Sequence, residues 1–203
     1  MLRRGLAAIA TALGAACGGG TTAPSSEVAY DFSFTDPVGD TTVATTNPRG
    51  VAAPDLRKIS GTIDRDNATI RLEFASSVSR WSGAGADALD GFINFDLDES
   101  MTGQVDQTRG IGVDAYVDLR DDGSGNVALV NLAAGKITLL AGTWDGNAFQ
   151  VKIPRQLLVN GQDNDNKFYL TVVTAGRDRR PNGDEAPDTD RFVVEPPAKS
   201  TTP

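Results

Sequence analysis

The chain has 203 residues, with 27 acidic against 19 basic side chains and a formal net charge of −8. This balance argues against a nucleic-acid partner, because phosphates require a basic surface. The sequence contains no histidine and a single cysteine, which excludes serine–histidine–acid triads, histidine–thiolate zinc sites and ordinary haem ligation. Among enzymatic chemistries, carboxylate chemistry such as glycoside hydrolysis by paired acids stays open.

The start of the chain predicts an export signal. Arg3 and Arg4 form a basic beginning, and an apolar run follows from Leu6 to Ala16. The run is too short to cross a bilayer as a helix, so residues 1–16 are expected to be a signal peptide. Its removal also takes away the two arginines, which makes the exported chain more acidic still.

Cys17 is the predicted lipid attachment site. The sequence LGAAC that ends at Cys17 resembles the lipobox of bacterial lipoproteins, in which the cysteine becomes the acylated first residue. As the only cysteine, it cannot form an internal disulfide. The alternative is a plain signal with an incidental cysteine. By the same resemblance, Gly18 rather than Asp after the cysteine favours the outer membrane. The polar, glycine-rich residues 17–26 then form a flexible tether to the membrane.

Residues 27–195 carry the pattern of short strands. Apolar and polar residues alternate with period two, and turn-forming residues separate the runs. No segment of useful length has helical periodicity, and residues 196–203 are expected to be a disordered tail. The pattern predicts one all-β domain, a single antiparallel β-sandwich of the jelly-roll type with nine or ten strands. The expected strands are Val28–Phe34, Ile59–Ile63, Ile70–Phe74, Ile93–Leu97, Val113–Leu119, Val127–Leu132, Ile137–Leu140, Ala148–Ile153, Lys167–Thr174 and Phe192–Val194.

The stretch GFINFDLDESMTG, residues 91–103, passes directly from a core strand into a carboxylate-rich turn. With strand period, Asp96 and Asp98 project from the same face, about 7 Å apart, and repel each other unless water, a basic group or a cation lies between them. Hard oxygen ligands at this spacing suit calcium. The alternative is an ordinary solvated strand end.

Alternating strand directions assign the connecting loops to the two ends of the sandwich. One end collects Asp36, Asp40, Asp55, Asp184 and Asp188, which come from three segments distant in sequence. We predict that these carboxylates form a calcium site. The other end collects a second candidate metal set, Asp96, Asp98 and Asp114.

Trp81 lies in a loop rich in small residues, SRWSGAGAD, at the first end. An exposed indole there could stack on a sugar ring, which makes Trp81 the candidate ligand-binding residue. The alternative is that the ring folds back over the edge of the core. Trp144 lies beside a tight hairpin turn and is expected to be structural.

Several motifs together resemble bacterial DOMON-like domains, which are similar in turn to family-9 carbohydrate-binding modules. They are DPVGD at residues 36–40, Asp55 with Leu56, GFINFDLD at residues 91–98, VKIPRQLL at residues 151–158, and the acids from Asp184 to Asp188. The resemblance implies a jelly-roll sandwich, calcium bound by loop carboxylates and a carbohydrate ligand. The chain departs from the haem-binding members, which need a methionine and a histidine.

Two functions from different classes follow. The first is a non-catalytic, calcium-stabilised module, anchored outside the cytoplasm by its lipid, that binds a ligand such as a carbohydrate. The second is a structural or assembly lipoprotein of the outer envelope without a small-molecule ligand. A carboxylate glycosidase is disfavoured, because a single small sandwich seldom encloses a substrate cleft.

Overall fold

The computed structural model describes residues 29–41, 54–83, 87–101, 104–106, 109–158, 167–175 and 183–198. The expected signal peptide, Cys17 and the tether lie outside these ranges, as does the end of the expected tail. Within the same ranges, no helix is long and apolar enough to cross a membrane.

The fold is all-β, as predicted, and every expected strand is found. The sequence alternation explains why: in β3, for example, the burial pattern alternates residue by residue, with the apolar side chains turned inward. The described elements are β1 (Tyr30–Thr35), β2 (Leu56–Ile63), β3 (Asn67–Phe74), β4 (Asp90–Asp96), β5 (Gln104–Asp106), β6 (Ile111–Val113), β7 (Ala115–Asp118), β8 (Asn126–Asn131), β9 (Lys136–Asp145), β10 (Ala148–Pro154), the 3₁₀ helix η1 (Arg155–Leu157), β11 (Phe168–Ala175), β12 (Gly183–Ala186) and β13 (Phe192–Val194).

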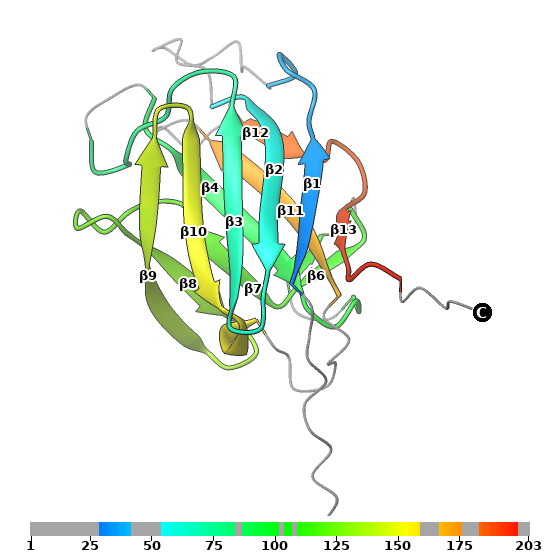
Figure 1. Ribbon diagram of the computed structural model, residues 1–203. Helices are drawn as coiled ribbons and strands as arrows, with labels where there is room; N and C mark the ends of the chain where they lie inside the picture. Colours follow the sequence, from blue (N-terminus) through cyan, green and yellow to red (C-terminus); the bar gives the residue numbers. More distant parts are fainter. Residues whose placement is uncertain are drawn as a thin grey trace, which may run out of the picture.

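The strands form two antiparallel layers that share one strand (Figure 1). The first layer has the order β1-β2-β3-β10-β9, and the second has the order β9-β8-β7-β4-β11-β12, with β13 also paired to β11. The first half of β9 pairs with β8, and its second half, from Gly142, pairs with β10. The two layers are therefore continuous along β9, whereas β1 and β12 end the sheet on the opposite side.

A single apolar core fills the space between the layers. Its largest fully buried side chains come from both layers and include Phe74 and Phe149 on one side and Phe95 on the other. At the open side, the rings of Phe34 and Phe192 stack with centroids 4.5 Å apart, which joins β1 to β13. The expected hairpins around residues 65–67 and 144–147 are both present.

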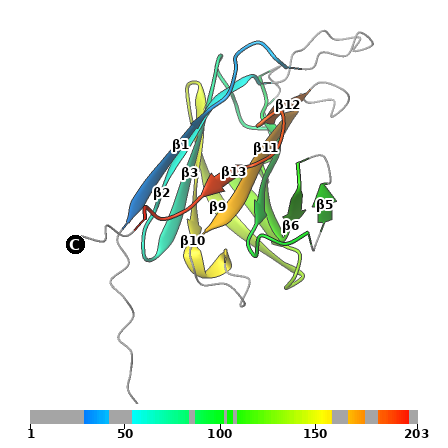
Figure 2. The ribbon, with the colours of Figure 1, turned by 90° about the vertical axis from the view of Figure 1, so that its right-hand side faces the viewer.

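Three short strands were not predicted. β5 and β6 form a separate two-stranded hairpin in the segment expected to be the loop after β4, and β12 lies in the segment expected to be the last long loop. Figure 2 shows β5 and β6 on the outer side of the second layer, away from β1 and β2. Strand period in the expected strand Val113–Leu119 would turn the side chain of Asp114 outward to solvent. The structure instead breaks this strand at Asp114, between β6 and β7, and Asp114 is buried.

Candidate metal centre

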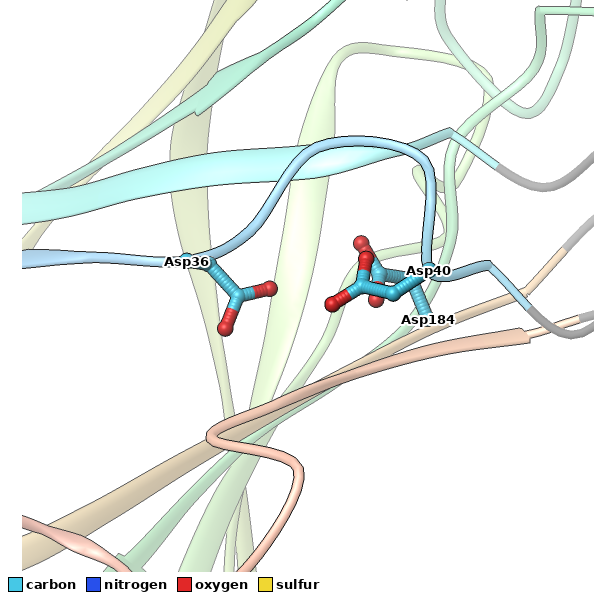
Figure 3. Close-up of side chains that lie close together, drawn as sticks. All are labelled: Asp36, Asp40 and Asp184. Atoms are coloured by element: carbon cyan, nitrogen blue, oxygen red, sulfur yellow. The ribbon is translucent and has the colours of Figure 1, made fainter.

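Three of the five acids predicted for the first site converge at the open side of the sandwich. Asp36 follows β1, Asp40 lies in the turn after it, and Asp184 lies in β12. One carboxylate oxygen from each lies within 4.8 Å of the others. Figure 3 shows the carboxylates of Asp40 and Asp184 side by side, with the carboxylate of Asp36 pointing toward them. Segments about 150 residues apart in the chain thus meet at one point.

The carboxylate of Asp36 is the unusual member of this group. The residue is 7% exposed, and both of its carboxylate oxygens are buried without a hydrogen-bond donor among the described residues. A buried carboxylate of this kind is costly unless a proton or a cation compensates it. The three acids therefore need a compensating positive charge, as the ligands of a cation site do.

Asp55 and Asp188 lie near this group but do not join it. Asp55 accepts a hydrogen bond from the backbone amide of Gly39 at 2.9 Å, and its other carboxylate oxygen is buried without a partner among the described residues. Asp188 is exposed, and its charge acts on both Asp36 and Asp184. The backbone amide of Leu56 donates to Asp184, which fixes β12 against β2. The two outer acids thus add negative charge around the three central ones.

Burial and crowding raise the pKa values of two of these carboxyl groups. Burial, followed by the negative charges of Asp184, Asp40, Asp188 and Asp55, raises the pKa of Asp36 to about 7. Burial also raises the pKa of Asp184 to about 6, against the opposing hydrogen bond from its amide donor. Without a counter-charge, the site therefore holds protons near neutral pH.

The donor set fits calcium. Calcium binds six to eight oxygens at about 2.3 to 2.6 Å, so oxygens on opposite sides of the ion are roughly 5 Å apart. The mutual separations of the three carboxylate oxygens lie inside that span. All the protein ligands are hard oxygens, and an exposed member, Asp40, leaves one side of the site open to water. Asp36, Asp40 and Asp184 are thus the residues that would hold the ion.

The second predicted acidic set is also brought together. Asp96 ends β4, Asp98 lies in the following turn, and Asp114 lies between β6 and β7. One carboxylate oxygen from each lies within 4.8 Å of the others. The chain thus has two separate acidic groups, since Asp96 and Asp184 belong to opposite ends of the second layer: Asp96 is paired with Tyr169, and Asp184 with Thr174.

The two tryptophans have different surroundings. Trp81 is half-buried at the turn that opens its loop, and its role as a sugar platform stays a prediction. Trp144 packs on the core, with its ring centroid 5.0 Å from that of Phe149, and the guanidinium of Arg80 lies 5.3 Å from its centroid. The structural role expected for Trp144 is therefore confirmed.

Sequence reasoning missed the side chain that supports the acidic segment β12. The guanidinium of Arg109 is buried, forms an ion pair with Glu185 and donates to the backbone carbonyl of Pro187. Arg109 lies in the segment expected to be the loop at the opposite end, and no periodicity marks it. Comparison of the chain with protein-family models and with curated proteins found no match.

Proposed function

We propose that this protein is a non-catalytic, calcium-stabilised module, anchored to the bacterial outer membrane by a lipid, that binds an extracytoplasmic ligand of the carbohydrate class. The resemblance to DOMON-like domains and family-9 carbohydrate-binding modules supports the ligand class. The lipobox-like sequence ending at Cys17 supports the anchor.

One observation carries the calcium part of the proposal. Both carboxylate oxygens of Asp36 are buried without a donor among the described residues, and the carboxylate points at those of Asp40 and Asp184. The same burial disfavours a glycosidase, because a carboxylate enclosed in this way is poorly placed to reach the glycosidic oxygen of a bound sugar. The acids are better suited to holding an ion than to transferring a proton.

A pocket of about 210 Å³ beside β8 and β9 offers a place for the ligand. The amides of Asn131 and Gln156 and the ammonium of Lys136 offer hydrogen-bond partners for sugar hydroxyls, and Leu157 and Ala134 offer apolar surface. This mixture of polar groups and apolar surface is the kind that small polar ligands use.

The alternative function is a structural or assembly lipoprotein. It is favoured by β9, whose outward side chains Ile137 and Leu139 are 66% and 58% exposed. Exposed apolar side chains next to one another on a strand are typical of a surface that contacts another protein. In that case the sandwich would present a contact surface and bind no sugar.

A glycan array separates these two functions. We expect the purified protein to bind one class of oligosaccharide in millimolar calcium, and Gln156→Ala to weaken that binding several-fold because it removes a hydrogen-bonding amide. The matched control is Gln150→Ala, which removes the same amide from a half-buried position in β10 outside the pocket. If no glycan is retained with calcium present and the protein folded, the carbohydrate proposal is wrong and the assembly function takes its place.

Replacement of the predicted lipid-bearing residue tests the anchor. We expect Cys17→Ser to give soluble or unprocessed protein, because membrane affinity should come from the acyl chains. Fractionation of cells that express the wild type and the variant measures this directly. Recovery of signal-cleaved Cys17→Ser protein with the membranes would contradict the lipoprotein assignment.

A further inference from the structure

The second acidic group lies beneath the hairpin that the sequence did not predict. Asp96 is 1% exposed, Asp114 is 5% exposed, and Asp98 is half-buried. Acids on the outer face of a strand normally face water, but here β6 lies against β4, and the backbone amide of Gly112 in β6 reaches the carboxylate of Asp96. Two carboxylates are therefore withdrawn from solvent with a third, half-buried one beside them, and this grouping demands a compensating charge.

Backbone amides hold two of these carboxylates in place without neutralising them. The amide of Gly112 donates to Oδ2 of Asp96 at 3.1 Å, and the amide of Leu97 donates to Oδ2 of Asp114 at 2.8 Å. Each bond ties one segment of the group to another: β6 to β4, and the end of β4 to the break after β6. The acids are thus preorganised by the main chain.

The remaining oxygen of Asp96 is the decisive observation. Its Oδ1 is buried and has no hydrogen-bond donor among the described residues, although Asp98 and Asp114 each place a carboxylate oxygen within 4.8 Å in the same group. Burial is the main reason that the pKa of Asp96 is raised, and the charges of Asp114 and Asp98 add to it. A buried acceptor without a donor, on a carboxylate grouped with two others, needs a positive partner.

Asp98 completes the arrangement from the turn after β4. Its Oδ1 accepts hydrogen bonds from the backbone amide and the hydroxyl of Ser100 at 3.0 and 2.7 Å. The next residue, Glu99, has a φ of +56° and directs its carboxylate to Lys167 and Tyr169. The turn is thus folded so that Asp98 stays with the acidic group while Glu99 takes the neighbouring lysine.

We propose that Asp96, Asp98 and Asp114 hold a second divalent cation, calcium by its ligand chemistry, which fastens the β5–β6 hairpin to the outer face of β4. The ligands are hard oxygens, and their separations lie within the roughly 5 Å span of a calcium shell. The site lies at the opposite end of β4 from Asp184. It is independent of the first metal centre and of the proposed ligand binding.

Backbone amides that donate to the acids provide reporters for each site separately. Leu97 and Gly112 report the second site. Leu56, which donates to Asp184, and Gly39, which precedes Asp40 and donates to the neighbouring Asp55, report the first. In ¹H–¹⁵N spectra of chelator-treated protein, added calcium should shift all four resonances. The amide of Ser82 donates to Asp121, outside both acidic groups, and should not move.

Variants then assign the two sites. In the variant Asp96→Asn/Asp98→Asn, the calcium stoichiometry from calorimetry should fall from two to one, and the Leu97 and Gly112 shifts should disappear while those of Gly39 and Leu56 persist. In the variant Asp36→Asn, the calcium-induced shifts of Leu97 and Gly112 should persist. Asp66→Asn, an exposed acid in the β2–β3 turn, is the matched loss of charge and should keep both sites.

The outcome that overturns the second site is distinct from the one that overturns the first. If calcium shifts Gly39 and Leu56 but leaves Leu97 and Gly112 unmoved in the wild type, the first centre stands and the second is wrong. Binding of calcium at full stoichiometry by the double variant would also refute the second site. Since Asp98 is only half-buried, the single change Asp98→Asn keeps the test decisive if the double variant does not fold.

Discussion

Millimolar calcium is expected to raise the melting temperature of the chelator-treated protein by roughly 5 to 10 °C. A ligand that binds only the folded state at a hundred times its Kd stabilises by about 2.7 kcal/mol, and each kcal/mol shifts the melting of a domain of this size by roughly 2 to 4 °C. The physical source is the relief of repulsion among Asp36, Asp40 and Asp184. The effect should increase with calcium concentration, as followed by circular dichroism.

Matched changes make this result specific. Magnesium should stabilise less, because it prefers a smaller octahedral shell. Asp40→Ala should weaken the calcium response, because it removes one ligand, whereas Asp66→Ala removes an exposed acid from the β2–β3 turn and should leave it unchanged. Part of the response should survive Asp40→Ala through the second acidic group. Identical melting temperatures in chelator and in millimolar calcium would end the calcium hypothesis.

Without calcium, the protein is expected to lose stability as the pH rises from 5 to 8. The folded-state pKa of about 7 for Asp36 and about 6 for Asp184 lie above the ordinary value of 3.8. The folded chain therefore binds more protons than the unfolded chain in this range, and its stability falls as the pH passes through these values. The loss is on the order of 2 to 4 kcal/mol for the pair.

The carboxyl groups with lowered pKa values do not oppose this loss of stability between pH 5 and 8. Hydrogen bonds lower the pKa of Asp64, Asp121 and Asp122, so their stabilisation is complete above the ordinary value and is lost only as the pH falls further. The pH dependence between 5 and 8 should therefore reflect the raised groups. Denaturant unfolding in chelator at several pH values measures it.

The variant Asp36→Asn is expected to have opposite effects on stability without calcium and with calcium. In chelator at pH 8 the variant should be more stable than the wild type, because an amide removes one of the repelling charges and can donate to the neighbouring carboxylates. In calcium the order should reverse, because a ligand has been lost. A variant less stable than the wild type at pH 8 in chelator would show that the Asp36 carboxylate is not a source of strain.

The strands could be predicted because their information is local. Alternation in segments such as β3 and the hairpin turn at residues 144–147 is visible in the sequence and decides which side chains are buried. β5, β6 and β12 could not be predicted in this way. Their sequences QVD, IGV and GDEA are too short or too polar to show alternation, and they form strands because a partner strand accepts their hydrogen bonds.

The sequence predicted which acids form the core of each group, although Asp55 and Asp188 do not join the first one, and it did not predict their burial. Counting the reversals of strand direction was enough to place Asp36 with Asp184 and Asp96 with Asp114. The two unpredicted strands β5 and β6 did not upset the count, because two added reversals leave the direction of every later strand unchanged. Burial could not be inferred, because it depends on what lies above each carboxylate. Asp96 and Asp114 are both buried, and the carboxylate of Asp96 lies against the hairpin strand β6, which no local sequence pattern predicts.

The strand β9 joins the two layers of the sandwich. Since the first half of β9 hydrogen-bonds to β8 and its second half to β10, a single strand belongs to both layers on that side. On the other side, described contacts between the layers include the stacked rings of Phe34 and Phe192, the Leu56–Asp184 bond and the hydrogen bond from Thr174 to the carbonyl of Pro54. We therefore expect the two layers, which are continuous along β9, to separate first on the side of β1 and β12 when the protein unfolds partially. The proposed ion, held by Asp36 from the end of β1 and Asp184 from β12, would link the two layers on that side.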